Sequence, residues 1–345
     1  MNRSILHVIA SLEGGGAERQ LALLASEQVR RGWRVELALR RGGVYETVLD
    51  PGVTIHRLGD HAGADPRLLA RLLHLVRAVR PDVVQTWLPQ MDVLGGAAAL
   101  AHRTPWVMTE RSVAAAYPTG WATTVRAWIG QRADAVVANS CAGASLWRRA
   151  VVIPNAIELA IGEPRDDAKL VFAGRLVADK APELLIDALV RVPRVRVVMF
   201  GEGPLRARLQ AEIDRHGLDV TLAGFRSDWT LQLATATALI NPSRVEGEPN
   251  VVLEAMAAGC PVIASDIPAH RELLADDRGI LVAVDDPAAL AAAITAVLAD
   301  PRARDRAHHA RDHVRDRTIA VTADRYEQVY TRVNAPARAG RTRLP

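Results

Sequence analysis

Residues 236–266 read ATALINPSRVEGEPNVVLEAMAAGCPVIASD, and this stretch decides the fold. It opens with a short β-rich apolar run at 236–243 and passes through a polar loop. The segment VVLEAMAA then repeats apolar residues at helical spacing and ends before Gly259, a residue suited to a helix C-terminus. A second β-rich run follows at 261–266. Strand, helix and strand in this order predict a parallel βαβ unit.

The same alternation extends along the chain in two series. Short β-rich runs, most of them followed by helical or loop segments, lie at 4–10, 33–40, 53–58, 82–87, 105–110 and 134–140, and again at 169–176, 195–203, 220–224, 236–243 and 261–266. Two such series in 345 residues predict an α/β protein with two doubly wound parallel-sheet domains facing across a cleft.

The domain boundary is expected where the periodicity breaks, in VIPNAIELAIGEPRDDAK at 152–169. We place the first domain at 1–162 and the second at 163–316. A helix at 317–334 is expected to pack back toward the first domain, and 335–345 has the composition of a disordered tail.

Composition excludes several classes of protein. Charged residues or Gly break the apolar runs before they reach the length of a membrane span, and the N-terminal run is too short for a signal peptide, so we expect a cytoplasmic protein. Cys141 and Cys260 have no Cys or His at ligand spacing, which argues against disulfides and zinc. The net charge of +4 lacks the pattern of a nucleic-acid-binding surface.

Two acids of the opening stretch form the first candidate site. Glu246 lies in the loop and Glu254 about one turn into the helix, at the expected carboxyl end of a parallel strand. The start of that helix is suited to bind an anion, and carboxylates accept hydrogen bonds from paired sugar hydroxyls. The alternative is that Glu254 only complements the helix dipole and Glu246 is a solvated loop charge.

Two cations form a second candidate site in FAGRLVADKAPELLIDAL. Gly174 ends a strand, Arg175 and Lys180 flank a short loop, and a helix begins near Pro182. This arrangement predicts a clamp for a diphosphate. The chain has 41 Arg and two Lys, so a Lys at this position is distinctive, although it is also compatible with a solvated surface residue.

A glycine-rich turn after the first strand, SLEGGGAERQ, lets the backbone approach a ligand closely. It does not match the dinucleotide fingerprint, because Arg19 stands where the last Gly is required, and GEGPLR at 201–206 fails in the same way. A nicotinamide-dependent oxidoreductase is therefore disfavoured. Glu18 is interpreted as a helix-start residue.

Together these segments resemble the GT-B glycosyltransferases of the retaining GT4 type, also called glycosyl transferases group 1. The hallmark is E-x7-E followed by EAMA-x-G-x-PV-x-A-S-D, which stands here from Glu246 to Asp266. GGGAERQLALLA at 14–25, VIPNAIE at 152–158 and FAGRL at 172–176 extend the likeness over nearly the whole chain.

The resemblance implies a metal-independent enzyme without a cofactor that moves a sugar from a nucleotide-diphosphate donor to a carbohydrate or lipid-linked acceptor. It implies that Glu254 binds the ribose, that Glu246 contacts the donor sugar, and that Arg175 and Lys180 act on the leaving diphosphate. The first domain would bind the acceptor and the second the nucleotide sugar. The implied donor-binding residues are Gly15, Gly16, Gly174, Gly201, Glu246, Gly247, Pro249, Asn250, Val251 and Glu254, with Arg175, Lys180 and Glu246 as the catalytic set.

The sequence departs from the family pattern after the fourth strand. Relatives often carry His in the loop there, and this chain has Gln85, Trp87 and Gln90, so no general base is assigned in the first domain. His7 and His56 are interpreted as core or edge residues of strands. Glu110, at another strand end, is either an acid of the cleft or a structural residue.

Two segments bear on the partners. The helix at 65–81 sets four Arg opposite a Leu stripe, and 117–132 contains Trp121 and Trp128. Such segments suit an anionic membrane surface, and equally a core-facing stripe with a solvated basic face. We expect peripheral attachment at the inner face of the plasma membrane and synthesis of a cell-envelope polysaccharide or glycolipid. A sugar phosphorylase or a non-transferring relative that binds sugar nucleotides is the alternative.

Overall fold

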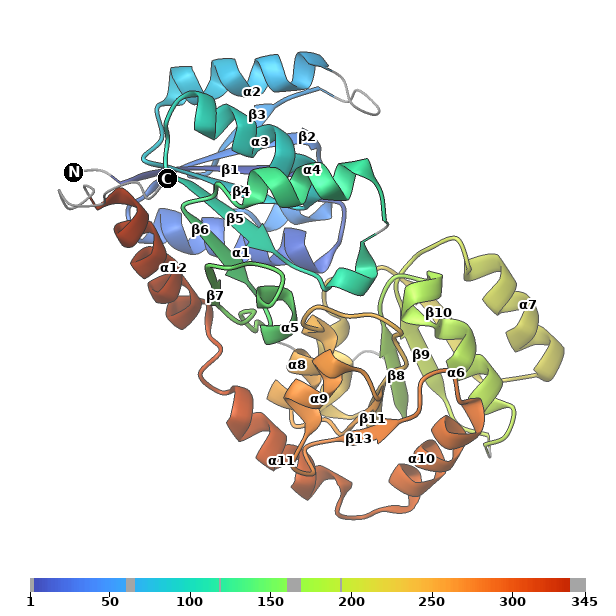
Figure 1. Cartoon of the computed structure of the whole chain (residues 1–345). Coiled ribbons are helices and arrows are strands. Elements are labelled where there is room, and N and C mark those ends of the chain that lie inside the picture. The colour runs from blue at the N-terminus through green and yellow to red at the C-terminus, as the bar shows by residue number, and fades with distance from the viewer. Residues whose placement is uncertain (1–2, 60–65, 118, 160–168, 193, 336–345) are drawn as a thin grey trace. The chain divides into compact units, whose positions relative to one another are not determined.

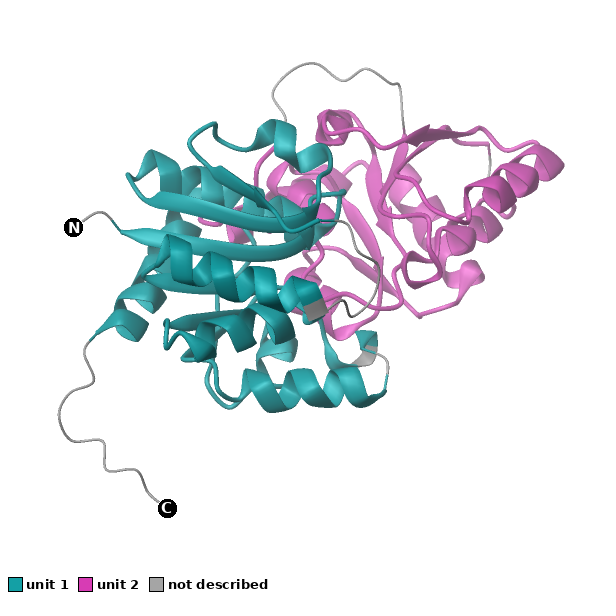
Figure 2. Cartoon of the chain, turned by 90° about the horizontal axis from the view of Figure 1, so that it is seen from above, with its two compact units in different colours: residues 1–156, 319–345 teal, residues 157–318 magenta. Residues whose placement is uncertain are grey.

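The computed structural model describes residues 3–59, 66–117, 119–159, 169–192 and 194–335 (Figure 1). The domain boundary predicted near residue 163 lies outside the described residues, as does the predicted tail from 336 onward. The chain divides into two compact units (Figure 2). Unit 1 comprises 1–156 and 319–345, and unit 2 comprises 157–318.

Unit 1 contains a seven-stranded sheet in the order β3-β2-β1-β4-β5-β6-β7. The strands are β1 Ser4–Ser11, β2 Arg34–Arg41, β3 Thr54–Arg57, β4 Val83–Trp87, β5 Trp106–Glu110, β6 Ala135–Ala138 and β7 Ala150–Val152. Every neighbouring pair is parallel, so all carboxyl ends meet at one edge. The strand order reverses between β1 and β4, which is the usual place for a ligand in such sheets.

Helices cover both faces of this sheet because its strands are buried on both sides. The helices are α1 Gly16–Arg30, α2 Pro66–Val79, α3 Pro89–Ala101, α4 Trp121–Gly130, α5 Cys141–Ala144 and α12 Ile319–Asn334, with short 3₁₀ helices η1 Val44–Val48 and η2 Ala114–Ala116. Within β1, Ile5 and Ile9 pack in one core with α1 and α12, and Leu6 and Val8 pack in another with α2, α3 and α4. Alternate residues of one strand thus serve opposite faces.

Unit 2 contains a six-stranded parallel sheet in the order β10-β9-β8-β11-β12-β13. The strands are β8 Leu170–Ala173, β9 Val197–Phe200, β10 Val220–Gly224, β11 Ala238–Asn241, β12 Val262–Ser265 and β13 Ile280–Val282. One face is covered by α6 Pro182–Leu189, α7 Arg206–His216 and α10 Pro287–Ala299, and the other by α8 Asn250–Ala257, α9 Pro268–Leu274 and α11 Ala303–Val314. The 3₁₀ helices are η3 Ala178–Lys180 and η4 Trp229–Ala234.

The fold class predicted from the sequence, two doubly wound parallel sheets with interleaved helices, is confirmed. The sequence patterns did not indicate the two edge strands β7 and β13. Each has three residues, which is too short for a period to emerge. No helix in the described part of the chain has the length and hydrophobicity to cross a membrane.

A buried chain of hydrogen bonds joins α1 and α12 to the sheet of unit 1. Trp87 Nε1 donates to His7 Nδ1 at 3.2 Å, so His7 carries its proton on Nε2 and donates to Gln28 Oε1 at 2.8 Å. Gln28 donates to the Tyr330 hydroxyl of α12, and Tyr330 donates to Gln85. Both nitrogens of His7 are therefore satisfied, which confirms the interpretation of His7 as a core residue.

Acid pH is expected to destabilise unit 1 through His7. Burial lowers the pKa of His7 to about 4, and the hydrogen bond with Gln28 only partly opposes this. In the unfolded chain His7 binds its proton near pH 6.5. The contribution of neutral His7 to the unfolding free energy is therefore complete above that pH and is lost as the pH falls from 6.5 toward 4. Between pH 7.5 and 5 the unfolding free energy should fall by about 2 kcal/mol more in the wild type than in His7→Gln.

Urea unfolding followed by tryptophan fluorescence measures this effect. Of the seven Trp, only Trp229 lies in unit 2, so the signal reports mainly on unit 1. Identical pH dependence in the wild type and His7→Gln would contradict the assignment.

Candidate functional site

The predicted site residues of unit 2 gather at the point where its strand order reverses. β8 and β11 are neighbours in the sheet, and Gly174, Arg175 and Lys180 follow β8 in the chain. The loop from Ser243 to Pro249 follows β11 and leads into α8 (Figure 1). Ligands of open parallel sheets bind at this position, beyond the carboxyl ends of the strands.

Lys180 and Glu246 form an ion pair at this point. Lys180 Nζ donates to Glu246 Oε1 at 2.6 Å, and the two side chains are only 21% and 10% exposed. Burial acts to raise the pKa of Glu246, but the charge and hydrogen bond of Lys180 outweigh it with help from Ser243, so the pKa lies below its ordinary value. Glu246 is therefore ionised at neutral pH and is matched by the Lys180 ammonium.

Arg244 fastens the two loops that carry this pair. Its backbone amide donates to the Asp179 carbonyl at 2.8 Å, and its guanidinium bonds Glu183 of α6 at 2.8 Å and Asp285 at 2.7 Å. Lys180 and Glu246 are 66 residues apart in sequence, and Arg244 holds the loop after β11 against the segment after β8. Arg244, which the sequence patterns did not single out, thus fixes how the two loops lie against each other.

The start of α8 lies directly after this loop. Pro249 is the N-terminal cap residue, and its carbonyl accepts from Val252 and Leu253. Asn250 and Val251 begin the first turn of the helix. Gly247 is buried in the loop, and Glu254 is 3% exposed one turn into the helix. The first turn therefore offers donors and a partial positive charge beside the Lys180–Glu246 pair.

Arg175 and the two predicted glycines lie in the loops after β8 and β9. Arg175 is exposed and forms no ion pair with another described residue. Gly174 could carry a Cβ without a clash, whereas Gly201 has φ +134° and a Cβ there would stand 1.9 Å from the Gly174 carbonyl oxygen. Gly201 is thus required by the close crossing of the two loops.

Substitution Gly201→Ala is expected to lower the unfolding free energy by about 2–5 kcal/mol, since it combines an unfavourable φ with a backbone clash. Gly217 is the matched control: it has φ +58°, and no atom lies within 4 Å of the place that an added Cβ would take. Gly217→Ala should cost only about 1 kcal/mol. Urea denaturation followed by circular dichroism compares the two, and equal losses would refute the role of the crossing.

Sequence reasoning missed a buried polar group beside the pair. Asn241 Oδ1 accepts from the Ser243 hydroxyl at 2.6 Å, and Ser265 donates to the Ser243 carbonyl. His270 Nδ1 lies 2.7 Å from the Ser265 carbonyl and so carries the ring proton, while burial lowers the pKa of His270 and keeps the ring neutral. Asn241 and Ser265 end β11 and β12 and Ser243 follows β11, and this position at the strand ends, in INPS and IASD, is the signal that could have identified these three; His270 lies in α9 and had no such signal.

Two atoms of this group are buried without a hydrogen-bond partner among the described residues, Asn241 Nδ2 and His270 Nε2. One is a donor and the other, in the neutral ring, an acceptor. Because buried polar atoms are almost always bonded, a water molecule or a polar ligand would satisfy this pair.

In unit 1, Gly15 and Gly16 lie at the start of α1, with Gly15 as the cap residue and Glu18 in the first turn.

Gln85 and Trp87 require a correction. The sequence pattern places them in the loop after the fourth strand, but both lie within β4 and are fully buried. Gln85 bonds Thr109 and Tyr330, and Trp87 bonds His7, so both side chains are core residues; only Gln90 lies beyond the strand.

Glu110 belongs to a buried ionic cluster. Arg126 donates to Asp92 at 2.8 Å and to Glu110 at 2.9 Å, and Tyr117 and Trp147 also donate to Glu110. Burial raises the pKa of Asp92 to about 6 although Arg126 opposes it. Both carboxylate oxygens of Glu110 accept hydrogen bonds from its neighbours in unit 1, including the Ser112 amide at 3.0 Å, which supports the interpretation of Glu110 as a structural residue.

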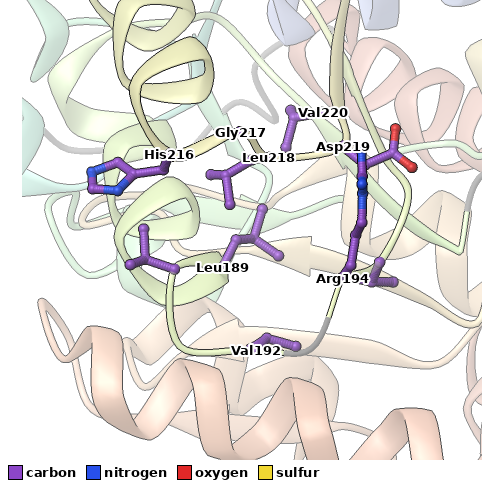
Figure 3. A pocket seen from close by; sticks show the side chains of 10 residues that line it. Leu189, Val192, Arg194, His216, Gly217, Leu218, Asp219 and Val220 are labelled. Atoms are coloured by element: carbon purple, nitrogen blue, oxygen red, sulfur yellow. The ribbon is translucent and has the colours of Figure 1, made fainter.

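A surface pocket of unit 2 lies away from these residues (Figure 3). Its volume is about 240 Å³, and Leu189, His216, Leu218 and Val220 are among its lining residues. These residues end α6 and α7 or enter β10, so the pocket is at the amino ends of the strands. It is not part of the candidate site.

Among the described residues, no cluster of His, Cys, Asp or Glu could hold a metal ion.

Comparison with known proteins defines the class. The family described as Glycosyl transferases group 1 matches residues 156–313, and Glycosyltransferase Family 4 matches residues 14–160. A glycogen synthase of Mycobacterium tuberculosis is 31% identical over 324 residues, covering 83% of this chain and 77% of that protein. The lipopolysaccharide core biosynthesis glycosyltransferase LpsE of Rhizobium meliloti is 26% identical over 312 residues, covering 85% and 88%.

A solved structure supports the fold. The crystal structure of Anabaena Alr3699/HepE in complex with UDP and glucose superposes with a TM-score of 0.86 at 22% identity, covering 96% of this chain and 100% of that one. The two sheets and the relatives define a GT-B enzyme that transfers glycosyl groups. The chain belongs to the group 1 glycosyltransferases.

Proposed function

We propose that the enzyme is a retaining, metal-independent glycosyltransferase of the GT4 type that moves a sugar from a nucleotide-diphosphate donor to an acceptor hydroxyl. The observation that carries the proposal is the Lys180–Glu246 ion pair, which lies where the strand order reverses and beside the first turn of α8. A cation, a carboxylate and the start of a helix at one strand end match the phosphates and hydroxyls of a sugar nucleotide.

The residues take the following roles. Arg175, Lys180 and the amides of 247–251 bind the diphosphate, Glu246 accepts hydroxyls of the donor sugar, and Glu254 accepts those of the ribose. Gly15 and Gly16 present backbone amides to the donor. Because Lys180 bonds Glu246 in this structure, a diphosphate competes with Glu246 for the ammonium.

Catalysis then consists mainly of charge stabilisation. Cleavage of the donor builds negative charge on the nucleotide diphosphate, and the guanidinium, the ammonium and the start of α8 stabilise it without a metal. Retention requires the acceptor to approach on the face that the phosphate leaves, so the departing phosphate takes the acceptor proton. No His of unit 1 is needed for this route.

Relatives support the class of donor and pathway. LpsE acts in lipopolysaccharide core biosynthesis, and HepE has been crystallised with UDP-glucose. We propose a nucleotide sugar as donor, a carbohydrate or lipid-linked acceptor, and synthesis of a cell-envelope polysaccharide or glycolipid by a cytoplasmic enzyme attached peripherally to the inner face of the plasma membrane.

A thermal-shift panel of nucleoside diphosphates identifies the donor base, since a ligand at 100 times its Kd adds about 2.7 kcal/mol of stability. Transfer from the matching sugar nucleotides is then assayed with EDTA present, and NMR gives the anomeric configuration of the product. Loss of activity in EDTA contradicts metal independence, and an inverted product contradicts retention. Turnover that requires inorganic phosphate and a glycoside, with no transfer from sugar nucleotides, identifies a phosphorylase.

A further inference from the structure

The outer surface of α4 is apolar and aromatic. Trp121 is 77% exposed, Val125 37% and Trp128 62%, and the spacing of four and three residues places all three on one side of the helix. The opposite side, with Arg126 and Ile129, is buried against the unit. Single exposed apolar side chains are ordinary, but two indoles with Val125 between them on one helical stripe form a patch that indicates a binding surface.

The surface around this stripe is basic. α3 packs against both α2 and α4, so the three helices form one layer on the sheet of unit 1 (Figure 1). The exposed basic residues of this layer and of the turns that end it are Arg67, Arg71, His74, Arg77, Arg80, His102, Arg103 and Arg132. The guanidinium of Arg132 lies over the Trp128 ring, 3.6 Å from its centroid, so a cation adjoins the stripe directly.

Acids are excluded from the outside of these helices. Among the residues of α2, α3 and α4, the one acid is Asp92, which is fully buried and bonded to Arg126. Two exposed acids, Asp82 and Asp134, lie outside the helices, in the connections that follow α2 and α4, and each accepts a hydrogen bond from a backbone amide, of Ser4 and of Trp106 respectively. The helical surface itself therefore has a uniform positive sign.

We propose that this α2–α4 surface docks on an anionic lipid bilayer, with Trp121 and Trp128 inserted at the headgroup level and the arginines attracting the surface. Indoles favour the membrane–water interface, and arginines favour anionic headgroups. A second copy of the chain fits poorly, because pairing this surface with itself would oppose like charges. The proposal names the surface that would attach the enzyme to the membrane. It rests on the proposed function only in that membrane binding would bring the transferase to a lipid-linked acceptor.

The test is flotation of the full chain with vesicles of phosphatidylcholine, alone or mixed with phosphatidylglycerol, in the absence of donor and acceptor. The wild type should bind the anionic vesicles and lose most of that binding near 1 M salt, where the screening length is about 3 Å. Trp121→Ser/Trp128→Ser should weaken binding about tenfold or more. Arg77→Glu/Arg103→Glu should abolish the preference for anionic lipid.

Matched controls come from unit 2. Val190→Ser/Leu298→Ser removes two exposed apolar side chains, and Arg191→Glu/Arg215→Glu reverses two exposed charges; both should bind like the wild type. Circular dichroism checks that every variant is folded. Three outcomes would overturn the proposal. The first is that the wild type fails to bind the vesicles, and the second is that the Trp variant binds them as well as the wild type. The third is that the Trp substitutions abolish a dimer, measured by light scattering, and leave lipid binding unchanged. Transfer to a water-soluble acceptor is measured separately, so failure here leaves the transferase assignment intact.

Discussion

Lys180→Ala is expected to lower kcat/KM for sugar transfer by about 10²–10³-fold, the usual effect of removing one charge that stabilises a developing anion. Lys180 lies within hydrogen-bond distance of Glu246 and next to the first turn of α8, where the proposed diphosphate binds. Lys180→Arg keeps the charge and should recover part of the loss, because a guanidinium binds phosphate with a different geometry.

The chain supplies its own control. Its other lysine, Lys169, is exposed and directly precedes β8, at the opposite end of the strand from Lys180. Lys169→Ala should leave transfer unchanged.

Chemical labelling gives an independent readout. Acetylation followed by mass spectrometry should show Lys180 protected by the nucleoside diphosphate and Lys169 labelled at the same rate with or without it. Equal activities of the two alanine variants, or no protection of Lys180, would remove the basis for the assigned role.

Glu246→Gln is expected to have opposite effects on binding and on turnover. The substitution keeps the shape of the side chain but removes the carboxylate that holds Lys180 at 2.6 Å. The freed ammonium should bind a nucleoside diphosphate about tenfold more tightly, a gain of about 1.4 kcal/mol. Transfer should fall about 100-fold, because the proposed hydrogen bonds to the donor sugar are weakened in the transition state.

Isothermal titration with the nucleoside diphosphate, and kinetics with the sugar nucleotide, measure the two effects. Glu202→Gln serves as a control, since Glu202 is exposed and pairs only loosely with Arg206 at 3.5 Å. A parallel loss of affinity and turnover in Glu246→Gln would mean that Glu246 positions Lys180 for the diphosphate instead of competing with it.

The sequence predicted most of the fold because its signals were local. Runs such as SILHVIA and PVIASD have the composition of buried parallel strands, and the helices between them are marked by Pro182 and Gly259 near their ends. The same local signals placed Glu246 in a loop and Glu254 one turn into α8, as the structure has them.

The contacts of the candidate site depended on distant partners and could not be predicted. That Lys180 bonds Glu246 follows from the neighbouring positions of β8 and β11 and from Arg244, which bonds Glu183 and Asp285. His270 resembled an ordinary helix residue until its burial and its hydrogen bond with Ser265 were visible. Gln85 and Trp87 were misplaced because they were matched to the loop in which relatives often carry His, whereas both lie in β4 and are bonded to Tyr330 and His7 inside the core.

The return of α12 to the first unit restricts how the enzyme can be dissected. Tyr326, Val329 and Tyr330 fill the same core as Ile5 and Leu24, although they come from the far end of the chain. A recombinant fragment that stops at residue 156 would expose that core and should aggregate, whereas 157–318 is one uninterrupted stretch and should fold alone. Isolation of the first half would require a circular permutation or a linker that reattaches its last helix.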